Sequence, residues 1–429
     1  MTRLNVVVLG LDESNLELLR RVPDADRYTF HGLLTIDQLQ LGDDIPIAEL
    51  LAEAEARIEA FDEPVHAVVG FWDFPVSTLV PVLCERFGLR GASLESVLRC
   101  EHKYWSRLVQ QEVIEEYPPF ALVDLDDPHL PAEVGYPCWL KPVKSFSSKL
   151  AFEVTDDREF AAALAELRDG IARVGEPFEY LLEQADLPAE IAAAGGQSAL
   201  AERALSGDRA AVEGYVQDGE VVVYGVLDSL IYPGVSSFLR HQYPSQQPVS
   251  MRDRLADVSR RVMAKVGLDN ATFSIEYFCD PATGDVSLLE INPRHSQAHA
   301  ELFEQVDGFP NHHYMLKAAL GEDPGPKGDG PYAISARWYL RRFSDGVLVR
   351  GPAEDEIAAV ERDIDGVKIH RKARDGARLS NEVGADSYSY ELAQIIVGAN
   401  TVAELEEKYE RCVAALPFEF AEEEEEGET

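Results

Sequence analysis

The segment 274–294 carries the side chains of this chain that are best suited to chemistry. Two apolar-rich runs flank an Asp-Pro-Ala-Thr-Gly turn signal, and this pattern predicts a β-hairpin. If the hairpin is symmetric about Thr283, Glu276 lies opposite Glu290, and side-chain alternation puts Asn292 on the same face. Because opposed like charges destabilise a strand pair, two glutamates beside an amide oxygen indicate a cation site. These hard oxygen donors suit Mg²⁺, or Mn²⁺ in its place. An ordinary exposed hairpin with its glutamates in water is the alternative.

Basic residues follow a second informative pattern. Arg294 lies on the same face of the expected strand as Glu290 and Asn292. Its planar guanidinium group can donate two parallel hydrogen bonds to a phosphate group. Lysine is scarce, at ten of the 39 basic residues, yet four lysines lie within 47 residues: Lys103, Lys141, Lys144 and Lys149. In an acidic chain this cluster predicts binding of an anion such as a polyphosphate, with local salt bridges as the alternative.

Composition limits the class of protein. The 429 residues suffice for two or three domains with cores of their own, and 46% of them are hydrophobic. No apolar run reaches the roughly 18 to 20 residues that a membrane span needs, and the N-terminus shows no cleavage site of a signal peptide. We therefore expect a cytoplasmic protein with no membrane partner. Five cysteines without paired spacing argue against a disulfide framework or a zinc site.

The net charge of −38 is spread along the chain, apart from a final glutamate run. Dispersed acid with scarce lysine predicts an origin in a halophile, where salt screens the repulsion between carboxylates. The same charge makes nucleic acid an unfavourable partner.

The elements that must position these residues begin with a small α/β domain. Strands alternate with helices, which predicts a parallel sheet: strands at 3–10, 29–36 and 65–71, and helices at 14–22, 46–60 and 75–87. A helix over 93–113 carries Lys103 and Arg107 four residues apart. The next stretch is expected to hold strands at 135–143, 150–155, 199–205, 211–217 and 221–229, and helices at 157–172 and 250–266.

The C-terminal part is expected to be separate. The Pro- and Gly-rich segment 323–331 predicts a linker. Residues 332–420 are expected to form an α+β unit, with strands near 332–341, 346–349 and 366–370 and a helix at 401–415. Residues 421–429 are an acidic tail.

With these pieces in order, the chain resembles the ATP-grasp superfamily over roughly residues 1–322. Three motifs carry the resemblance: Leu289-Glu-Ile-Asn-Pro-Arg294, Gly135-Tyr-Pro-x-x-x-Lys-Pro142, and Glu95-Ser followed by Lys103. The resemblance implies a mixed α/β and α+β fold with an α/β domain at 1–92 and an ATP-grasp domain at 93–322. The small lobe of that domain spans about 130–220, and a C-terminal α+β domain follows.

The resemblance also implies roles for single residues. Lys103 and Lys141 are expected to hold the α- and β-phosphates of ATP, and Arg294 to meet the γ-phosphate or an acyl phosphate. One or two Mg²⁺ ions would lie on the three hairpin ligands. The loop that closes over phosphates is usually glycine-rich in this superfamily, whereas 144–149 contains no glycine.

The adenine hinge is expected at 201–205, followed by an acidic strand residue, Glu213. The backbone here would pair with adenine, with Asp208 near the ribose; the cofactor residues are Glu202, Arg203, Ala204 and Leu205. The segment 180–185 is a rival hinge. Further along, four residues are expected at the substrate: Arg240, His295, Ser296 and His299. A surface salt bridge is an equal alternative for Arg240.

Two branches of the superfamily fit the motifs. Biotin carboxylases place a catalytic Glu four residues after the motif arginine, where this chain has Ala298. The C-terminal part instead resembles ligases that join a carboxylate to an amine through an acyl phosphate. We therefore expect a carboxylate–amine ligase acting on small molecules, and a homodimer by resemblance. A biotin carboxylase-like subunit, or an ATP-binding protein with little catalysis, are the alternatives.

Overall fold

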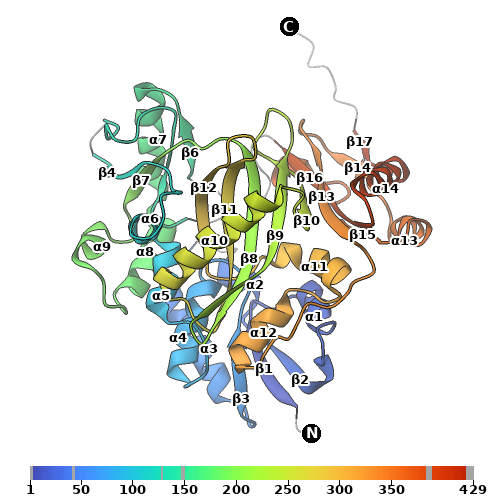
Figure 1. Cartoon of the computed structure of the whole chain (residues 1–429), viewed down its shortest axis with the longest axis horizontal. Helices are drawn as coiled ribbons and strands as arrows, with labels where there is room; N and C mark the ends of the chain where they lie inside the picture. Colours follow the sequence, from blue (N-terminus) through green and yellow to red (C-terminus); the bar gives the residue numbers. More distant parts are fainter. Residues whose placement is uncertain (1–2, 41–43, 127–128, 146–149, 383–388, 422–429) are drawn as a thin grey trace. The chain divides into compact units, whose positions relative to one another are not determined.

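The computed structural model describes residues 3–40, 44–126, 129–145, 150–382 and 389–421 (Figure 1). It consists of two compact units. The first comprises residues 1–226, 247–297 and 311–325, and the second comprises 227–246, 298–310 and 326–429. These units divide the chain differently from the three domains that the sequence suggests, at 1–92, 93–322 and 332–420, and that division stays a prediction.

The first unit begins with a parallel sheet in the order β2-β1-β3. Its strands are apolar because helices cover them; in β1, Val6 to Leu9 are fully buried. The elements are β1 (Leu4–Leu9), α1 (Glu13–Leu19), η1 (Ala25–Arg27), β2 (Tyr28–Leu33), α2 (Ile36–Gln40), α3 (Ile47–Glu59), β3 (Val65–Val69) and α4 (Val76–Arg86). The predicted strands and helices of this region are confirmed to within a few residues at their ends.

The helix predicted over 93–113 is two helices, α5 (Leu94–Glu101) and α6 (Lys103–Gln111). At His102 the backbone is extended, and the His102 side chain accepts a hydrogen bond from the N–H of Trp105. The N–H of Lys103 donates to the carbonyl of Val143 at 2.8 Å rather than continuing the first helix. The break therefore ties Lys103 to the end of strand β5.

A second sheet of this unit is antiparallel, in the order β4-β7-β5-β6. Its elements are β4 (Phe120–Val123), β5 (Cys138–Pro142), β6 (Phe152–Val154), α7 (Asp157–Gly170), α8 (Ala172–Leu182), α9 (Ala189–Ala194) and β7 (Ala199–Arg203). The sequence pattern missed β4, α8 and α9. Pro177 lies inside α8, and a proline within a helical pattern normally argues against a helix.

The hairpin lies in the remaining strands of the first unit, ordered β12-β11-β8-β9. One face of β11 packs on α10: Ile275 and Tyr277 are fully buried, and the Tyr277 hydroxyl contacts Ser259 of that helix at 2.7 Å. The other face carries Glu276. The elements are β8 (Asp208–Gln217), β9 (Glu220–Ile231), α10 (Val249–Val266), β11 (Ala271–Asp280), β12 (Asp285–Asn292) and α12 (His312–Leu320).

The second unit contains the end of β9 and the strands ordered β10-β13-β16-β15. Trp338 of β13 stacks on Tyr409 of α14 with ring centroids 4.5 Å apart. The elements are β10 (Phe238–Tyr243), α11 (Ala300–Asp307), β13 (Ile334–Arg342), β14 (Leu348–Arg350), α13 (Glu354–Asp363), β15 (Val367–Arg371), η3 (Leu379–Asn381), β16 (Tyr390–Ala399), α14 (Val402–Ala415) and β17 (Glu419–Phe420); η2 (Gln297–His299) spans the boundary between units.

Each of the five cysteines is a buried free thiol. Within the described residues, no helix is both long and apolar enough to cross a membrane.

Candidate functional site

The predicted hairpin and its register are confirmed. Glu276 pairs with Glu290, and Ser274 pairs with Asn292, so both predicted acidic ligands and the amide lie on one face. Near the turn the register differs by one residue, because Tyr277 pairs with Leu288. A β-bulge at residue 289 restores the symmetry about Thr283, and without it the two glutamates would not face each other.

The two hairpin glutamates have different environments. Glu290 forms an ion pair with Lys103, with Nζ 2.9 Å from Oε1. Burial by itself raises the pKa of Glu290, but the charges of Lys103 and Lys141 outweigh it and lower that pKa. For Glu276, burial and the charge of Glu290 together raise the pKa to about 7. Glu276 is therefore the half-buried carboxylate of this pair whose negative charge is not fully compensated by nearby cations.

These residues fit a divalent metal. Two carboxylates and the Asn292 amide are hard oxygen donors, and Mg²⁺ commonly takes one or two carboxylates and completes its shell with waters and phosphates. A bound cation would remove the electrostatic cost that holds the pKa of Glu276 high. Across the described residues, no group of three or more His, Cys, Asp or Glu side chains forms a closed metal cage.

Lys141, the second predicted phosphate ligand, lies in strand β5 and is buried. Its Nζ is 2.6 Å from Oε2 of Glu202, and burial lowers the pKa of Lys141 although the Glu202 charge opposes this. Glu202 also receives two bonds from Arg107, at 2.8 and 3.2 Å. The sequence had assigned Glu202 to adenine through its backbone, whereas its side chain joins the two cations.

Arg107 is a residue of this site whose role the sequence did not reveal. It is almost fully buried, and besides Glu202 it donates to the carbonyls of Leu288 and Leu289 at 3.1 and 2.7 Å. These carbonyls belong to the bulge of β12. One guanidinium thus holds both the bulge that aligns the glutamates and the carboxylate that pairs with Lys141. The four-residue spacing from Lys103 was visible, but a buried guanidinium reveals its partners only in the folded chain.

The pKa of Glu202 gives a test by acid. Burial alone would raise it, but Arg107 and Lys141 lower it from 4.5 to about 2. A carboxylate with a depressed folded pKa stabilises the protein above its unfolded pKa, and this contribution is lost as pH falls from about 4.5 to about 2. We expect urea midpoints of the wild type and Glu202→Gln, measured against pH, to converge over that interval. A difference that stays constant down to pH 2.5 would contradict this assignment.

Arg294 lies just beyond the end of β12 and is mostly buried. Its Nε donates to Oδ1 of Asp73 at 2.8 Å, and its Nη2 contacts the same oxygen. Burial lowers the pKa of Arg294, but Asp73 outweighs that and the net shift is upward. The predicted phosphate ligand is thus held by a carboxylate from the loop after β3.

The turn after Arg294 is fixed by Glu213. Glu213, the acidic strand residue expected after the hinge, is fully buried. It accepts hydrogen bonds from the hydroxyl of Tyr224 at 2.8 Å and from the N–H of Ser296 at 3.1 Å. Ser296 is therefore held through its backbone, and its role as a substrate residue stays a prediction.

The backbone at the expected hinge is partly engaged. Residues 199–203 pair with β4 on one side and β5 on the other, and the N–H of Ala204 donates to the carbonyl of Pro137. The N–H of Leu205 has no hydrogen-bond acceptor among the described residues. Asp208 contacts Gln247 at 3.1 Å, and Arg203 donates to the carbonyl of Val134 at 2.9 Å. Among the described residues of the expected hinge, the backbone N–H groups of Arg203 and Ala204 are therefore engaged, and that of Leu205 is not.

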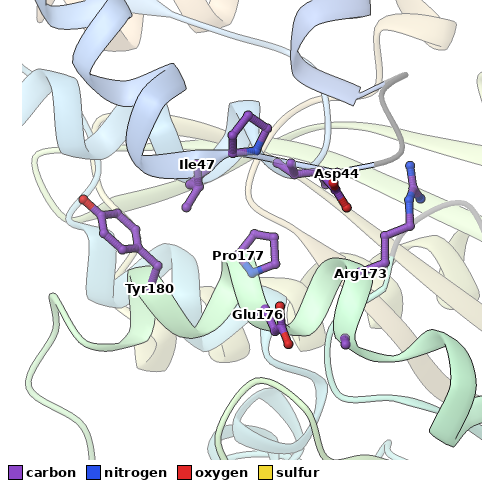
Figure 2. A pocket seen from close by; sticks show the side chains of 9 residues that line it. Asp44, Ile47, Arg173, Glu176, Pro177 and Tyr180 are labelled. Carbon is purple, nitrogen blue, oxygen red and sulfur yellow. The ribbon is translucent and has the colours of Figure 1, made fainter.

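The rival hinge is wrong. Tyr180 to Leu182 lie in α8, where backbone groups are used within the helix. The helix lines a separate hollow of about 560 Å³ beside the start of α3. In Figure 2, Pro177 and Tyr180 of the helix lie on the side of Ile47, and Arg173 lies on the side of Asp44. Its lining includes none of the predicted phosphate or metal residues and none of residues 201–205.

Other predicted residues have structural contacts. His295 is fully buried, with Nδ1 3.2 Å from the Thr272 hydroxyl, so the expectation that it faces a substrate pocket is wrong. Lys144 is buried and forms an ion pair with Glu101 at 2.6 Å, which agrees with the local salt bridge that the sequence gave as the alternative. Lys149 lies outside the described residues.

Two predicted substrate residues belong to the second unit. Arg240 pairs with Glu406 at 3.0 Å and stacks over Trp338, as in the salt-bridge alternative. The Arg240 side chain is 9% exposed and that of Glu406 is 52% exposed. His299 is buried with its ring 4.9 Å from that of His241.

Comparison with known proteins agrees with this geometry. The family model described as ATP-grasp domain matches residues 134–300. The carbamoyl phosphate synthase large chain of Xylella fastidiosa is 25% identical over 245 residues, which cover 55% of this chain and 20% of that one. The chain thus spans about a fifth of the length of this curated relative.

Two solved structures cover nearly the whole chain. The L-amino acid ligase of Bacillus licheniformis has a TM-score of 0.71 at 14% identity, with 98% of this chain and 100% of that chain covered. The biotin carboxylase domain dimer of 2-oxoglutarate carboxylase from Hydrogenobacter thermophilus, solved with MgADP, ADP and bicarbonate, has a TM-score of 0.64 at 14% identity and covers 98% and 92%. The chain therefore has the ATP-grasp fold, and its residues 134–300 match the ATP-grasp domain family.

Proposed function

We propose that this protein is an ATP- and Mg²⁺-dependent ligase that joins a carboxylate to an amine, releasing ADP and phosphate. The observation that carries the proposal is the convergence of the opposed Glu276 and Glu290 with Lys103 and Lys141 in one partly buried cluster. An L-amino acid ligase among the structural neighbours supports this class of reaction.

The proposed reaction has two steps. A carboxylate oxygen of the acid attacks the γ-phosphorus of ATP, and the bond to the β-γ bridging oxygen breaks to release ADP. The amine nitrogen then attacks the acyl carbon, phosphate leaves, and the amine gives up one proton to phosphate or solvent. Lys103, Lys141 and Arg294 are proposed to neutralise the charge of the transferring group. Their carboxylate partners keep these cations in position before the nucleotide arrives.

The metal and nucleotide residues follow from the same cluster. Glu276, Glu290 and Asn292 would hold Mg²⁺, which Mn²⁺ can replace, and the metal would supply charge stabilisation to the phosphates. Two lysines and the arginine are the proposed phosphate ligands. Contact with adenine is assigned to the backbone at 204–205, with Asp208 beside the ribose.

An assay for an acyl phosphate tests the proposal. The full chain is incubated with ATP, Mg²⁺ and pools of carboxylic acids in 2 M KCl, with hydroxylamine as a general amine acceptor. We expect acid-dependent ADP release and formation of a hydroxamate in equal amounts. ADP release that depends on bicarbonate and free biotin, without hydroxamate, would instead favour the biotin carboxylase-like alternative. Nucleotide binding without turnover in any pool would favour an ATP-binding protein.

The salt dependence of stability tests the proposed halophilic origin. With a net charge of −38, repulsion between carboxylates opposes folding at low salt, and salt screens it. We expect the thermal midpoint to rise by on the order of 10 °C between 0.1 and 2 M KCl. Sodium chloride at equal ionic strength should act alike. A midpoint that is unchanged or lower in 2 M KCl would contradict the proposal.

A cytoplasmic location and a homodimer complete the proposal. The structure of the Hydrogenobacter thermophilus neighbour is a domain dimer, and light scattering of the full chain in 2 M KCl measures the oligomeric state here.

A further inference from the structure

We propose that Asp73 recognises the ammonium group of the acid that is activated, so that the acid is an amino acid. This inference rests on the proposed function and names its substrate class. It starts from the contact between Asp73 and Arg294, which the ATP-grasp motif does not include.

The backbone beneath Asp73 is fixed from several directions. Gln40 donates through Nε2 to the carbonyls of Asp73 and Phe74 at 3.2 and 3.0 Å. The indole of Trp72 donates to the carbonyl of Gly10 at 2.9 Å, and the Phe74 ring is fully buried. A loop held in this way presents its carboxylate in a defined place, as preorganised recognition requires.

Only one of the two carboxylate oxygens of Asp73 contacts Arg294. Both Arg294 contacts go to Oδ1, while among the described residues Oδ2 of Asp73 has no hydrogen-bond donor. The side chain is 37% exposed, whereas that of Arg294 is 14% exposed. An accessible acceptor oxygen therefore lies beside the arginine that is proposed to meet the phosphate.

The charges near Oδ2 of Asp73 determine which kind of group this oxygen can bind. Asp73 is a partly exposed carboxylate whose one ion-pair partner among the described residues, Arg294, contacts only Oδ1, so an anion at Oδ2 is disfavoured by repulsion. When Arg294 turns to phosphate, Asp73 loses its partner, and an uncompensated carboxylate in a partly buried site is costly. A positively charged group of the substrate would offset this cost.

The chemistry of the second step identifies the substrate that carries this group. An amine held by a carboxylate is protonated, and a protonated amine has no lone pair with which to attack an acyl phosphate. The ammonium at Asp73 therefore belongs to the acid and stays charged throughout, while the attacking amine is a different group. An α-amino acid, with its ammonium one carbon from the reacting carboxylate, has this arrangement.

Matched acids test the inference. Hydroxamate formation is measured with alanine against propionate and with phenylalanine against 3-phenylpropionate, for wild type, Asp73→Asn and Asp73→Glu. We expect kcat/KM of the wild type to favour the amino acid by roughly 10- to 150-fold, the range for a charged hydrogen bond. Asp73→Asn should abolish that preference, and Asp73→Glu should restore part of it.

The control is Asp62→Asn, the same change at an exposed residue of the same unit, which should keep the preference of the wild type. Equal use of amino and desamino acids by the wild type would overturn the inference. So would a loss in Asp73→Asn that is equal for both acids, because Asp73 would then act only through Arg294.

Failure of the proposed function can be distinguished from failure of this inference about Asp73. If no acid gives hydroxamate, the ligase proposal fails, and binding then decides the inference. Calorimetry with Mg²⁺ and a non-hydrolysable ATP analogue compares alanine with propionate. Preferential binding of alanine that disappears in Asp73→Asn supports the recognition of ammonium, and equal or absent binding of both acids rejects it.

Discussion

Glu290→Gln should lower ATP turnover by about 1,000-fold or more while leaving the fold intact. The amide keeps the size of the side chain and can still accept a hydrogen bond from Lys103, now 2.9 Å away. It removes the charge that the proposed metal needs, and charge stabilisation by a metal is worth several kcal/mol in the transition state. The measurement is ADP release under saturating ATP at Mg²⁺ concentrations from 0.1 to 50 mM.

The matched control is Glu153→Gln, at an exposed position of strand β6, which should retain wild-type turnover. The thermal midpoint of Glu290→Gln should stay close to that of the wild type, so that loss of activity is not loss of fold. Turnover within tenfold of the wild type, with the same Mg²⁺ requirement, would refute the metal assignment.

Glu202→Gln should destabilise the first unit by about 3–5 kcal/mol at pH 7. The change leaves Lys141 and Arg107 buried without their carboxylate, and removal of one partner from a buried ion pair has effects of this size. Both partners are largely hidden, since the side chains of Glu202 and Arg107 are 4% and 3% exposed. Urea denaturation measures the loss.

Tryptophan fluorescence makes this measurement specific to one unit. Of the four tryptophans, Trp338 belongs to the second unit, so a Trp338→Phe background confines the signal to the first. Glu166→Gln, at an exposed position of α7, should change stability by less than about 0.5 kcal/mol. A loss below 1 kcal/mol for Glu202→Gln would mean that the two cations find other compensation.

The sequence was informative where local rules apply. Period-two alternation and the Asp-Pro-Ala-Thr-Gly turn were enough to place Glu276 opposite Glu290. Alternating apolar runs located the first parallel sheet. These features depend on interactions between residues that are a few positions apart. Such local interactions can be predicted directly from the amino-acid sequence.

Prediction failed where distant contacts override the local pattern. The helix over 93–113 breaks because Val143 accepts the N–H of Lys103, and α8 forms although it contains Pro177. His295 looked like a pocket residue but is packed in the interior. Each outcome depends on contacts with residues far along the chain. The spacing of apolar residues carries no information about such contacts.

By itself, the sequence determined the hairpin, its facing glutamates, the two lysines and the ATP-grasp resemblance, because turn chemistry, side-chain alternation and short motifs are local properties. Only the tertiary structure decided which carboxylate accompanies each cation: Glu290 with Lys103, Glu202 with Lys141, and Asp73 with Arg294. The physical reason is that a buried charge pairs with whichever opposite charge the fold brings within about 3 Å, and these partners lie 61 to 221 residues apart in the chain.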